Sequence, residues 1–253
     1  TEQLGTEIPN YKIDNLNKIA LWQATGSGKT LLMHMNILSL QHHMNKNERG
    51  HHFNKILLIT PNEGLSEQHL QEFQDSNIPA RRFDDGAQLN LLTSGSDSII
   101  EVLEITKLKE VKGQKTIAVE SFGQNNIVFV DEGHRGATGT DWKDKRDYLS
   151  AEGFAIEYSA TFGQVVKVTN KATDKKQFAE YAKSIVFDYS YKYFYNDGYG
   201  KEFKILNLKQ NVLDQHKFIY LVASLLTYYQ QLKLYNLHKK KFQGFNLYEP
   251  LMV

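Results

Sequence analysis

A short glycine-rich segment that ends in lysine and threonine is the first part of the sequence that could do chemistry. It consists of Ala24, Thr25, Gly26, Ser27, Gly28, Lys29 and Thr30. Glycines let the backbone curl so that its N–H groups point at phosphate oxygens, and the N-terminus of a following helix adds a favourable dipole. The lysine can reach the outer phosphates, and the threonine hydroxyl can ligate Mg²⁺. The segment therefore predicts a site for the phosphates of a nucleotide.

Two adjacent carboxylates, Asp131 and Glu132, form the second candidate group, and His134 follows them. An aspartate at the end of a strand can hold Mg²⁺ through water, and the next carboxylate can orient or deprotonate the attacking water. Two acids in a row also occur in ordinary turns at strand ends. Together with the earlier phosphate loop, the pair indicates a site that hydrolyses a nucleotide.

A third group, Ser159, Ala160 and Thr161, also follows an apolar run. Small hydroxyl residues are frequent in turns, so this group alone predicts nothing. It becomes informative as the third polar group in chain order, with the spacing that a parallel sheet would produce.

Short apolar runs precede these groups, and helical patterns lie between the runs. We predict strands at Ile19–Trp22, Ile56–Ile59, Thr116–Val119, Ile127–Val130 and Phe154–Tyr158, and helices at Thr30–Met44 and Ser66–Phe73. Continuous apolar strands that alternate with helices indicate an α/β fold with a mostly parallel sheet covered on both faces. Ligands of such sheets bind beyond the carboxyl ends of the strands, where the three polar groups lie.

The pattern changes after residue 168. We predict a polar loop leading into a helix over Asn170–Lys183, strands at Ser184–Phe187 and Phe203–Leu206, and a long helix over Asn211–Phe242. The apolar residues of the long helix lie near one stripe along it.

The composition limits the class of protein. The chain has 253 residues, 41% hydrophobic and 23% charged, which is ordinary for a folded protein with a sizeable core. Its formal net charge of +1 argues against binding nucleic acid by bulk electrostatics alone. The chain has no cysteine, which excludes disulfides and cysteine-ligated metal sites. Without a signal-peptide pattern or an apolar run of about eighteen residues, we expect a cytoplasmic protein with no membrane span.

The three polar groups, in this order, resemble motifs I, II and III of superfamily-two helicases of the DExH type. The segment Asn125–Gly136 is most similar to the restriction subunits of type III restriction-modification enzymes. The family's segment after motif III also resembles Ser184–Tyr199. Gln23 stands where a strict phosphate loop has glycine, but that glycine is dispensable in helicase-type loops.

The resemblance implies a RecA-like P-loop NTPase domain, the first of two motor domains that bind ATP and Mg²⁺ in the cleft between them. Lys29 and Thr30 would contact phosphate and magnesium. Asp131 would hold magnesium and Glu132 would activate water. The adenine-recognising glutamine of the family has no convincing counterpart here, since Gln3 is a poor candidate.

The resemblance also assigns residues to the coupling of nucleotide and DNA. His134, Ser159 and Thr161 would transmit the nucleotide state to DNA. The position of motif Ia, which touches the nucleic-acid backbone, is matched loosely by Thr60, Pro61 and Asn62. A plain loop between strand and helix explains those three residues equally well.

The predicted organisation has three parts. Residues 1–168 form the RecA-like motor domain with motifs I, Ia, II and III, residues 169–248 its C-terminal part, and residues 249–253 the start of a second motor domain. The family's arginine finger lies in that second domain, and a nuclease domain follows it. We therefore expect the isolated chain to bind ATP weakly and to hydrolyse it hardly at all.

The predicted function is that of a DNA-translocating ATPase, the restriction subunit of a type III enzyme. Its partners would be DNA and a modification methyltransferase subunit. One alternative is another superfamily-two translocase, such as a type I restriction or DNA-repair helicase, which the sequence downstream would distinguish. The other is a nucleotide-binding module without catalysis, which DNA-stimulated ATPase activity would exclude.

Three further features have simpler explanations. The histidines His42, His43, His51 and His52 lack helical spacing and an acidic partner, which favours a solvated loop over a metal site. The alternating tyrosines Tyr189, Tyr191, Tyr193 and Tyr195 could stack on bases from a strand, but the family likeness favours a short helix before Gly198 with mostly packed rings. Lys239–Lys241 is explained better as a charge cluster at a helix C-terminus than as a DNA site.

Overall fold

The computed structural model describes residues 10, 17–47, 52–83, 99–109, 117–135, 140–166, 172–200, 214–242 and 249–251. The chain divides into two compact units, Thr1–Lys201 and Glu202–Val253. The candidate site lies entirely in the first unit.

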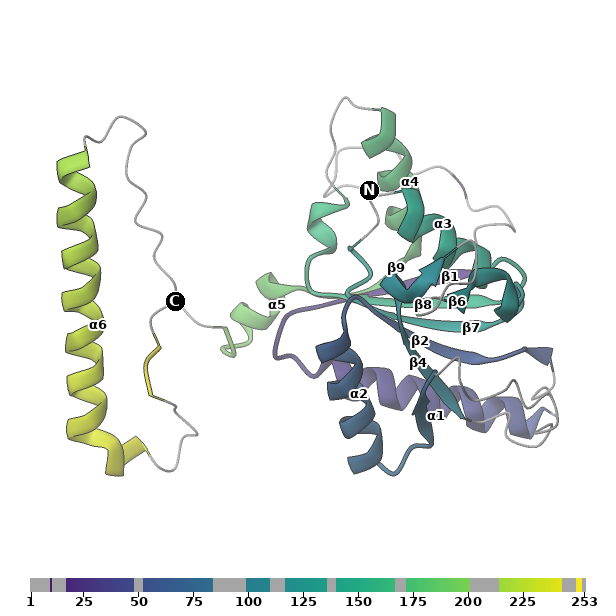
Figure 1. The fold of residues 1–253 in the computed structure, drawn as a ribbon, viewed down its shortest axis with the longest axis horizontal. Coiled ribbons are helices and arrows are strands. Elements are labelled where there is room, and N and C mark those ends of the chain that lie inside the picture. The colour runs from purple at the N-terminus through teal and green to yellow at the C-terminus, as the bar shows by residue number, and fades with distance from the viewer. Residues whose placement is uncertain are drawn as a thin grey trace. The chain divides into compact units, whose positions relative to one another are not determined.

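A seven-stranded sheet forms the centre of the first unit (Figure 1). Its strands, in spatial order, are β3 (Ala80–Arg82), β4 (Ile100–Glu104), β2 (Ile56–Thr60), β7 (Ile127–Asp131), β8 (Phe154–Ser159), β1 (Lys18–Gln23) and β9 (Ile185–Tyr189). Every pairing in this sheet is parallel. A separate pair of short strands, β5 (Leu108–Lys109) and β6 (Ile117–Ala118), is also parallel.

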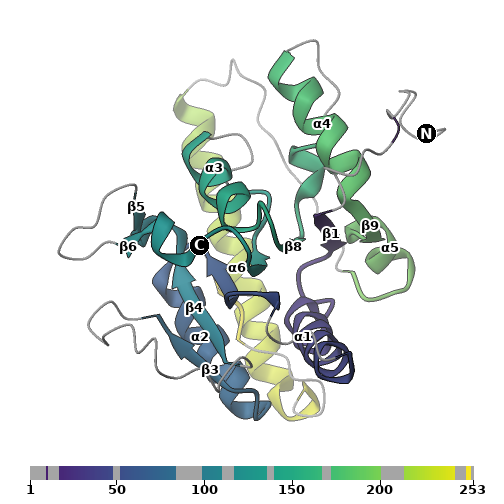
Figure 2. The same ribbon diagram turned by 90° about the vertical axis from the view of Figure 1, so that its right-hand side faces the viewer.

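Helices cover both faces of the sheet, as Figures 1 and 2 show together. On one face lie α1 (Lys29–Lys46) and α2 (Glu63–Asp75), and on the other lie α3 (Thr140–Leu149) and α4 (Ala172–Ser184). A short helix α5 (Tyr191–Asn196) follows β9. Single 3₁₀ turns are η3 (Ile105–Lys107), η4 (Val119–Phe122) and η5 (Phe162–Gln164).

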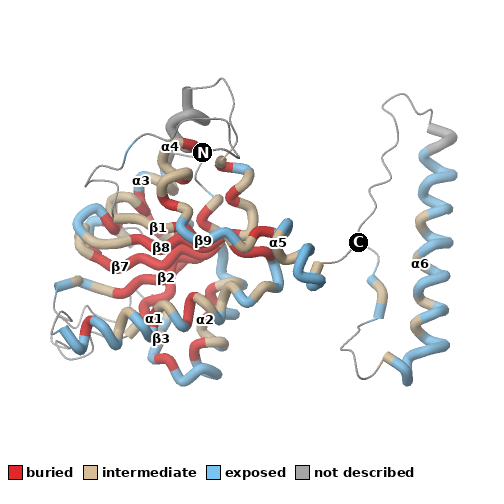
Figure 3. The backbone as a smooth tube through the Cα atoms, turned by 180° about the vertical axis from the view of Figure 1, so that it is seen from behind, coloured by how far each residue is buried: buried red, intermediate tan, exposed pale blue. Residues whose placement is uncertain are grey.

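The strand β2 explains why the apolar runs in the sequence are continuous. All five of its residues are buried, and the buried strands form the centre of the unit in Figure 3. Ile56 and Leu58 pack in the cluster that includes residues of α1 and α2, whereas Leu57 and Ile59 pack in the cluster that includes α3. Successive side chains of a strand point to opposite faces, so a sheet with helices on both sides needs apolar residues at every position.

Most predicted elements are confirmed, with ends that differ by a few residues. The α/β class, the parallel sheet and the strands at β1, β2, β7 and β8 are as expected. The expected strand at residues 116–119 is only partly right, because it is the two-residue β6 in the separate pair and Val119 begins a 3₁₀ turn. The strands β3 and β4 and the helix α3 were not predicted.

The region after residue 168 continues the same sheet. The predicted strand there is β9, which pairs with β1, and the first compact unit extends to Lys201. The expected strand Phe203–Leu206 lies outside the described residues. The division of the chain into three parts stays a prediction.

The helical reading of the tyrosine-rich segment is confirmed, since α5 spans Tyr191–Asn196. Its packing is looser than expected, because Tyr191 and Tyr195 are exposed and their rings tilt against each other, with centroids 6.1 Å apart.

The second unit contains the long helix α6 (Asp214–Phe242), which confirms the predicted helix. Many of its large apolar side chains are exposed, including those of Phe218, Ile219, Leu226 and Tyr229. Among the described residues, no helix has both the length and the apolar composition to cross a bilayer.

A cluster of charged residues fastens α3 and α4 to the sheet. Lys18 Nζ of β1 lies 3.0 Å from Asp147 of α3, 2.9 Å from Glu180 of α4 and 3.5 Å from Glu157 of β8. Burial alone would lower the pKa of Lys18, but the three carboxylates outweigh it and raise that pKa. Lys143 also bridges Asp147 and Glu180. Lys18 therefore stays charged at neutral pH, and its contacts join four elements.

The burial of Lys18 leads to a prediction about stability. Lys18→Met should lower the free energy of unfolding by about 1–3 kcal/mol, because it removes the nearest cation from the fully buried Glu157, while Lys143 still bridges Asp147 and Glu180. Arg82→Met is the matched control, since Arg82 also bridges two acids, Glu63 and Glu67, but both are exposed. Its effect should be much smaller, because water screens exposed pairs. Urea denaturation measures both, and equal losses would contradict the role given to burial.

Candidate nucleotide-binding site

The predicted phosphate loop connects the end of β1 to the start of α1. The backbone is left-handed at Gly26 (φ 82°) and Gly28 (φ 90°), a conformation that side chains with a Cβ rarely adopt. The N–H of Ala24 donates to Tyr189 O at 2.9 Å, and the N–H of Ser27 donates to Ala24 O at 3.1 Å. The first bond holds the start of the loop against β9, and the second closes a turn within the loop.

The loop has the properties of an anion site. Gly28 caps the N-terminus of α1 without a side-chain hydrogen bond, and the first turn carries no acidic residue. The Ser27 hydroxyl is buried and makes no hydrogen bond to the described residues. The free N–H groups of a helix start and an unused hydroxyl are donors suited to phosphate oxygens. The residues present therefore fit the phosphates of a nucleotide.

Lys29 joins the loop to the acid pair at the end of β7. Its Nζ lies 2.8 Å from Asp131 Oδ1 and 2.7 Å from Glu132 Oε1. Asp131 is buried and Glu132 is half-buried. Because parallel strands end at the same edge of a sheet, residues 29 and 131 meet although β8 lies between their strands.

The charges of this group are set by their contacts. Burial would raise the pKa of Asp131, but the hydrogen bond with His69 and the charge of Lys29 lower it to about 2. The hydrogen bond from His134 is the largest factor that lowers the pKa of Glu132. Burial alone would lower the pKa of Lys29, but the carboxylates of Asp131 and Glu132 outweigh burial and raise that pKa. At neutral pH the group therefore consists of one cation and two carboxylates.

Magnesium fits the donor set of this group. Ionised carboxylate oxygens and a hydroxyl are ligands that Mg²⁺ prefers. Asp131 would supply the carboxylate, and Thr30, next to Lys29 in the first turn of α1, would supply the hydroxyl.

The turn after Asp131 places Glu132 in an unusual backbone conformation. Glu132 has φ 55°, which is left-handed and uncommon outside glycine. Its N–H donates to Asp131 Oδ1 at 2.9 Å. The ring of His134 lies between two oxygens, with Nδ1 3.3 Å from Glu132 Oε2 and 2.7 Å from Ser159 Oγ. The conformation of Glu132 is held by contacts on both sides.

Gly133 is clamped between β8 and α3. Its N–H donates to Tyr158 O at 2.9 Å, and its carbonyl accepts from Arg146 Nη1 at 2.9 Å. A Cβ on Gly133 would lie 2.9 Å from both Cβ and Oε2 of Glu157. Only glycine fits this close approach without a shift of the neighbouring strand.

The third predicted group is only partly engaged with the second. Ser159 Oγ lies against His134 and also accepts a hydrogen bond from the N–H of Thr161 at 3.0 Å. The Thr161 hydroxyl is buried and has no hydrogen-bond partner among the described residues. Among the described residues, Thr161 is therefore linked to His134 indirectly, through the hydrogen bond of its N–H to Ser159.

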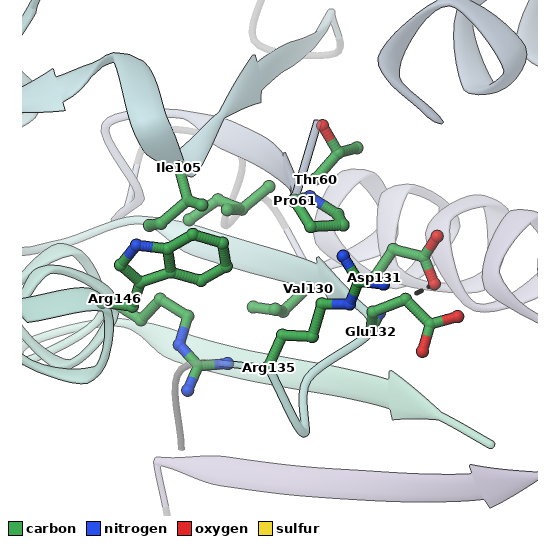
Figure 4. A pocket seen from close by; sticks show the side chains of 10 residues that line it. Thr60, Pro61, Ile105, Val130, Asp131, Glu132, Arg135 and Arg146 are labelled. Carbon is green, nitrogen blue, oxygen red and sulfur yellow. Dashed lines mark hydrogen bonds between the residues drawn. The ribbon is translucent and has the colours of Figure 1, made fainter. Parts of the chain in front are cut away.

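The predicted DNA-contacting loop follows β2, whereas the Ser159 group follows β8, and β7 with the acid pair lies between these two strands. A small pocket at the carboxyl ends of β2 and β7 is lined by residues that include Thr60, Pro61, Asp131, Glu132, Arg135 and Arg146 (Figure 4). Asn62 points elsewhere, because its side chain caps α2 by accepting from the N–H of Leu65 at 3.0 Å. Pro61 and Thr60 thus share a cavity with the carboxylates, and Asn62 fixes the helix that follows.

Two residues at the site were not found from the sequence. His69 of α2 contacts Asp131, and Arg146 of α3 holds Gly133. The helix α2 buries Ser66, His69 and Phe73 on one face, so a histidine on the apolar stripe was the available signal for His69. Arg146 had none, since its helix was not predicted.

A family model matches the part of the chain that contains these residues. The model described as "Type III restriction enzyme, res subunit" matches residues 3–164, which is more than half of the chain. No curated protein matches the chain.

Several solved helicase structures are similar to the chain at low identity. UvsW of bacteriophage T4 is 17% identical over 64% of this chain and 30% of its own, with a TM-score of 0.39. The helicase domain of Pyrococcus furiosus Hef is 13% identical over 69% and 34%, with a TM-score of 0.41. The arterivirus nonstructural protein 10 helicase, solved with DNA, is 14% identical over 58% and 29%, with a TM-score of 0.33. The chain thus spans about a third of each of these three chains.

The position of Gly133 leads to a second prediction. Gly133→Ala should lower the free energy of unfolding by about 1–3 kcal/mol, the usual cost of overpacking. Gly64→Ala is the matched control, because a Cβ there meets only Asn62 Oδ1 at 3.5 Å and alanine favours a helix by about 0.5–1 kcal/mol. The two changes should therefore shift the urea midpoint in opposite directions. If the urea midpoint of Gly133→Ala equals or exceeds that of the unchanged chain, β8 can shift to accept the extra Cβ at little cost, which would contradict the prediction.

Proposed function

Because the chain belongs to the family of type III restriction enzyme Res subunits, we propose that it is the ATP-binding first motor domain of a DNA-translocating type III restriction subunit. Its motor domain is of the superfamily-two, helicase-like ATPase class, with a RecA-like α/β sheet. DNA and a modification methyltransferase subunit are the partners we propose, and the cytoplasm is the location.

The contact of Lys29 with both Asp131 and Glu132 is the observation that carries the proposal. A phosphate loop alone fits many nucleotide-binding proteins. Lys29 of the loop lies within 3 Å of two ionised carboxylates that follow β7, the second strand from β1 in the sheet. This supports the proposal, because phosphate, metal and water would then bind within one small volume.

The roles of the residues follow from their chemistry. Backbone N–H groups of residues 26–30 and Lys29 would bind the phosphates of ATP. Thr30 and Asp131 would hold Mg²⁺, which when bound supplies positive charge to the phosphate oxygens. Glu132, whose backbone N–H donates to Asp131 and whose carboxylate contacts His134, would orient the attacking water and accept its proton.

The loop Thr60–Asn62 is the proposed contact with the DNA backbone. It lies at the carboxyl edge of the sheet, and two of its residues, Thr60 and Pro61, line the pocket of Figure 4 together with Asp131 and Glu132. Small polar groups and backbone N–H groups are common phosphate contacts. A chain of formal charge +1 is compatible with such local contacts.

Replacing the two carboxylates separately tests the proposed roles. Glu132→Gln keeps size and hydrogen bonding, so the chain should bind ATP with unchanged affinity. Asp131→Ala removes a metal ligand, so it should weaken binding by roughly tenfold or more, and only when Mg²⁺ is present. Isothermal titration with Mg²⁺ and with chelator measures both changes. Equal losses in the two variants would mean that the roles are wrongly assigned.

The Ser159 contacts give a prediction about coupling. Ser159→Ala in an enzyme that contains this chain and translocates on DNA should leave much of its ATPase activity but lower triplex displacement per ATP hydrolysed. The reason is that Ser159 links His134 to the backbone of Thr161, and changes of such contacts switch bistable elements. Ser184→Ala is the control, since this serine is also buried and its hydroxyl donates to Glu180 O at 2.9 Å, with no contact to His134 or Thr161 among the described residues. If triplex displacement per ATP hydrolysed is unchanged in Ser159→Ala, Ser159 has no role in coupling and only packs at the end of its strand.

A further inference from the structure

The histidine of α2 that contacts Asp131 has no role in the proposed reaction so far. The side chains of both residues are almost fully buried, with 3% of His69 and 4% of Asp131 exposed. Their closest atoms, His69 Nε2 and Asp131 Oδ2, are 3.0 Å apart. A buried hydrogen bond between these two groups is expensive to break, since neither can turn to water instead.

The two oxygens of Asp131 have separate sets of donors. Oδ1 faces Lys29 Nζ at 2.8 Å and accepts the N–H of Glu132 at 2.9 Å. Oδ2 faces His69. Lysine side chains are flexible and Lys29 is also the predicted phosphate ligand, so His69 is the donor that can keep the carboxylate in place when Lys29 moves to a phosphate.

The tautomer of His69 follows from the charge of its partner. The carboxylate of Asp131 accepts hydrogen bonds, as its contacts with Lys29 Nζ and with the N–H of Glu132 show. His69 therefore donates from Nε2. Its Nδ1 is buried and has no hydrogen-bond partner among the described residues, so the ring has no competing polar contact there. The ring of Phe73, with its centroid 6.3 Å away, packs beside it.

The helix that carries His69 is also fixed to the loop Thr60–Asn62. Thr60 Oγ1 lies 2.6 Å from Ser66 Oγ, and Asn62 accepts from the N–H groups of Leu65 and Ser66 at 3.0 and 3.2 Å. The first turn of α2 is thus bonded to the loop, and its second turn is bonded to Asp131. A displacement of the loop would move His69 with it, because a helix is stiff over two turns.

We propose that His69 is a positioning residue that holds Asp131 Oδ2 so that the carboxylate keeps a fixed orientation toward Mg²⁺. It touches neither nucleotide nor water, and it acts through Asp131 alone. The helix α2 makes this orientation depend on the loop that we propose contacts DNA. The inference rests on the proposed function, since it assumes that Asp131 is a metal ligand.

Two amide replacements of His69 provide the test. The amide nitrogen of glutamine can reach the place of Nε2, whereas that of asparagine, one methylene shorter, cannot. Groups that orient a metal ligand typically contribute 10–100-fold to metal affinity. His69→Asn should therefore reduce the Mg²⁺-dependent gain in affinity for a non-hydrolysable ATP analogue by about tenfold or more, and His69→Gln should restore most of it. Affinity in chelator should be unchanged in both. Isothermal titration of the chain itself gives these values without any measurement of hydrolysis.

A second buried histidine is the matched control. His34 of α1 is also buried, stacks on Phe73 with centroids 4.5 Å apart, and lies with Nδ1 3.0 Å from Ser76 Oγ. No contact joins it to Asp131 among the described residues. His34→Asn should lower the thermal unfolding midpoint as His69→Asn does but leave the Mg²⁺-dependent gain unchanged.

The outcomes separate the inference from the function on which it rests. If the unchanged chain shows no Mg²⁺-dependent gain in affinity, the proposed function fails and the inference fails with it. If the gain is present and His69→Asn keeps it, only the role of His69 is overturned. The same holds if His34→Asn loses the gain as fully as His69→Asn, because packing between α1 and α2 would then explain the effect.

Discussion

The electrostatic contact of Lys29 with Asp131 and Glu132 is the interaction around which the described part of the first unit is arranged. Lys29 Nζ lies within 3 Å of an oxygen of each carboxylate, and the three side chains are partly or fully buried. Such a group is stable only where further donors satisfy the carboxylates. His69, His134 and the N–H of Glu132 supply these donors from α2 and from the turn itself. Removing any one of them leaves a charge that water reaches poorly.

The strand β8 is the platform for this group, although it carries none of the three charges. It lies between β7 and β1 in the sheet. Glu157 and Ser159 are two residues apart and so point to the same face. Glu157 lies under Gly133, and Ser159 contacts His134. The turn that carries Glu132 therefore rests on neighbouring side chains of one strand, which explains why its left-handed backbone is maintained.

Two polar helix contacts support the site from opposite faces of the sheet. Arg146 of α3 is buried and donates to the carbonyl of Gly133. His69 of α2, on the other face, donates to Asp131. Each helix thus fixes one residue of the acid turn. Movement of either helix relative to the sheet would change the position of a carboxylate, and this is the kind of small displacement that a motor protein can amplify.

The sequence alone determined the fold class and the three polar groups of the site. Residues 24–30, 131–134 and 159–161 are contiguous runs that follow apolar strands, so local pattern and residue chemistry were enough to predict them. It did not reveal β4, because Glu101 and Glu104 interrupt the apolar pattern and become buried, Glu101 against Lys55 at 2.8 Å. Nor did it reveal His69 and Arg146 as parts of the site. Single polar residues on helices acquire partners only when strands distant in sequence come to lie side by side, and that proximity was decided by the tertiary structure.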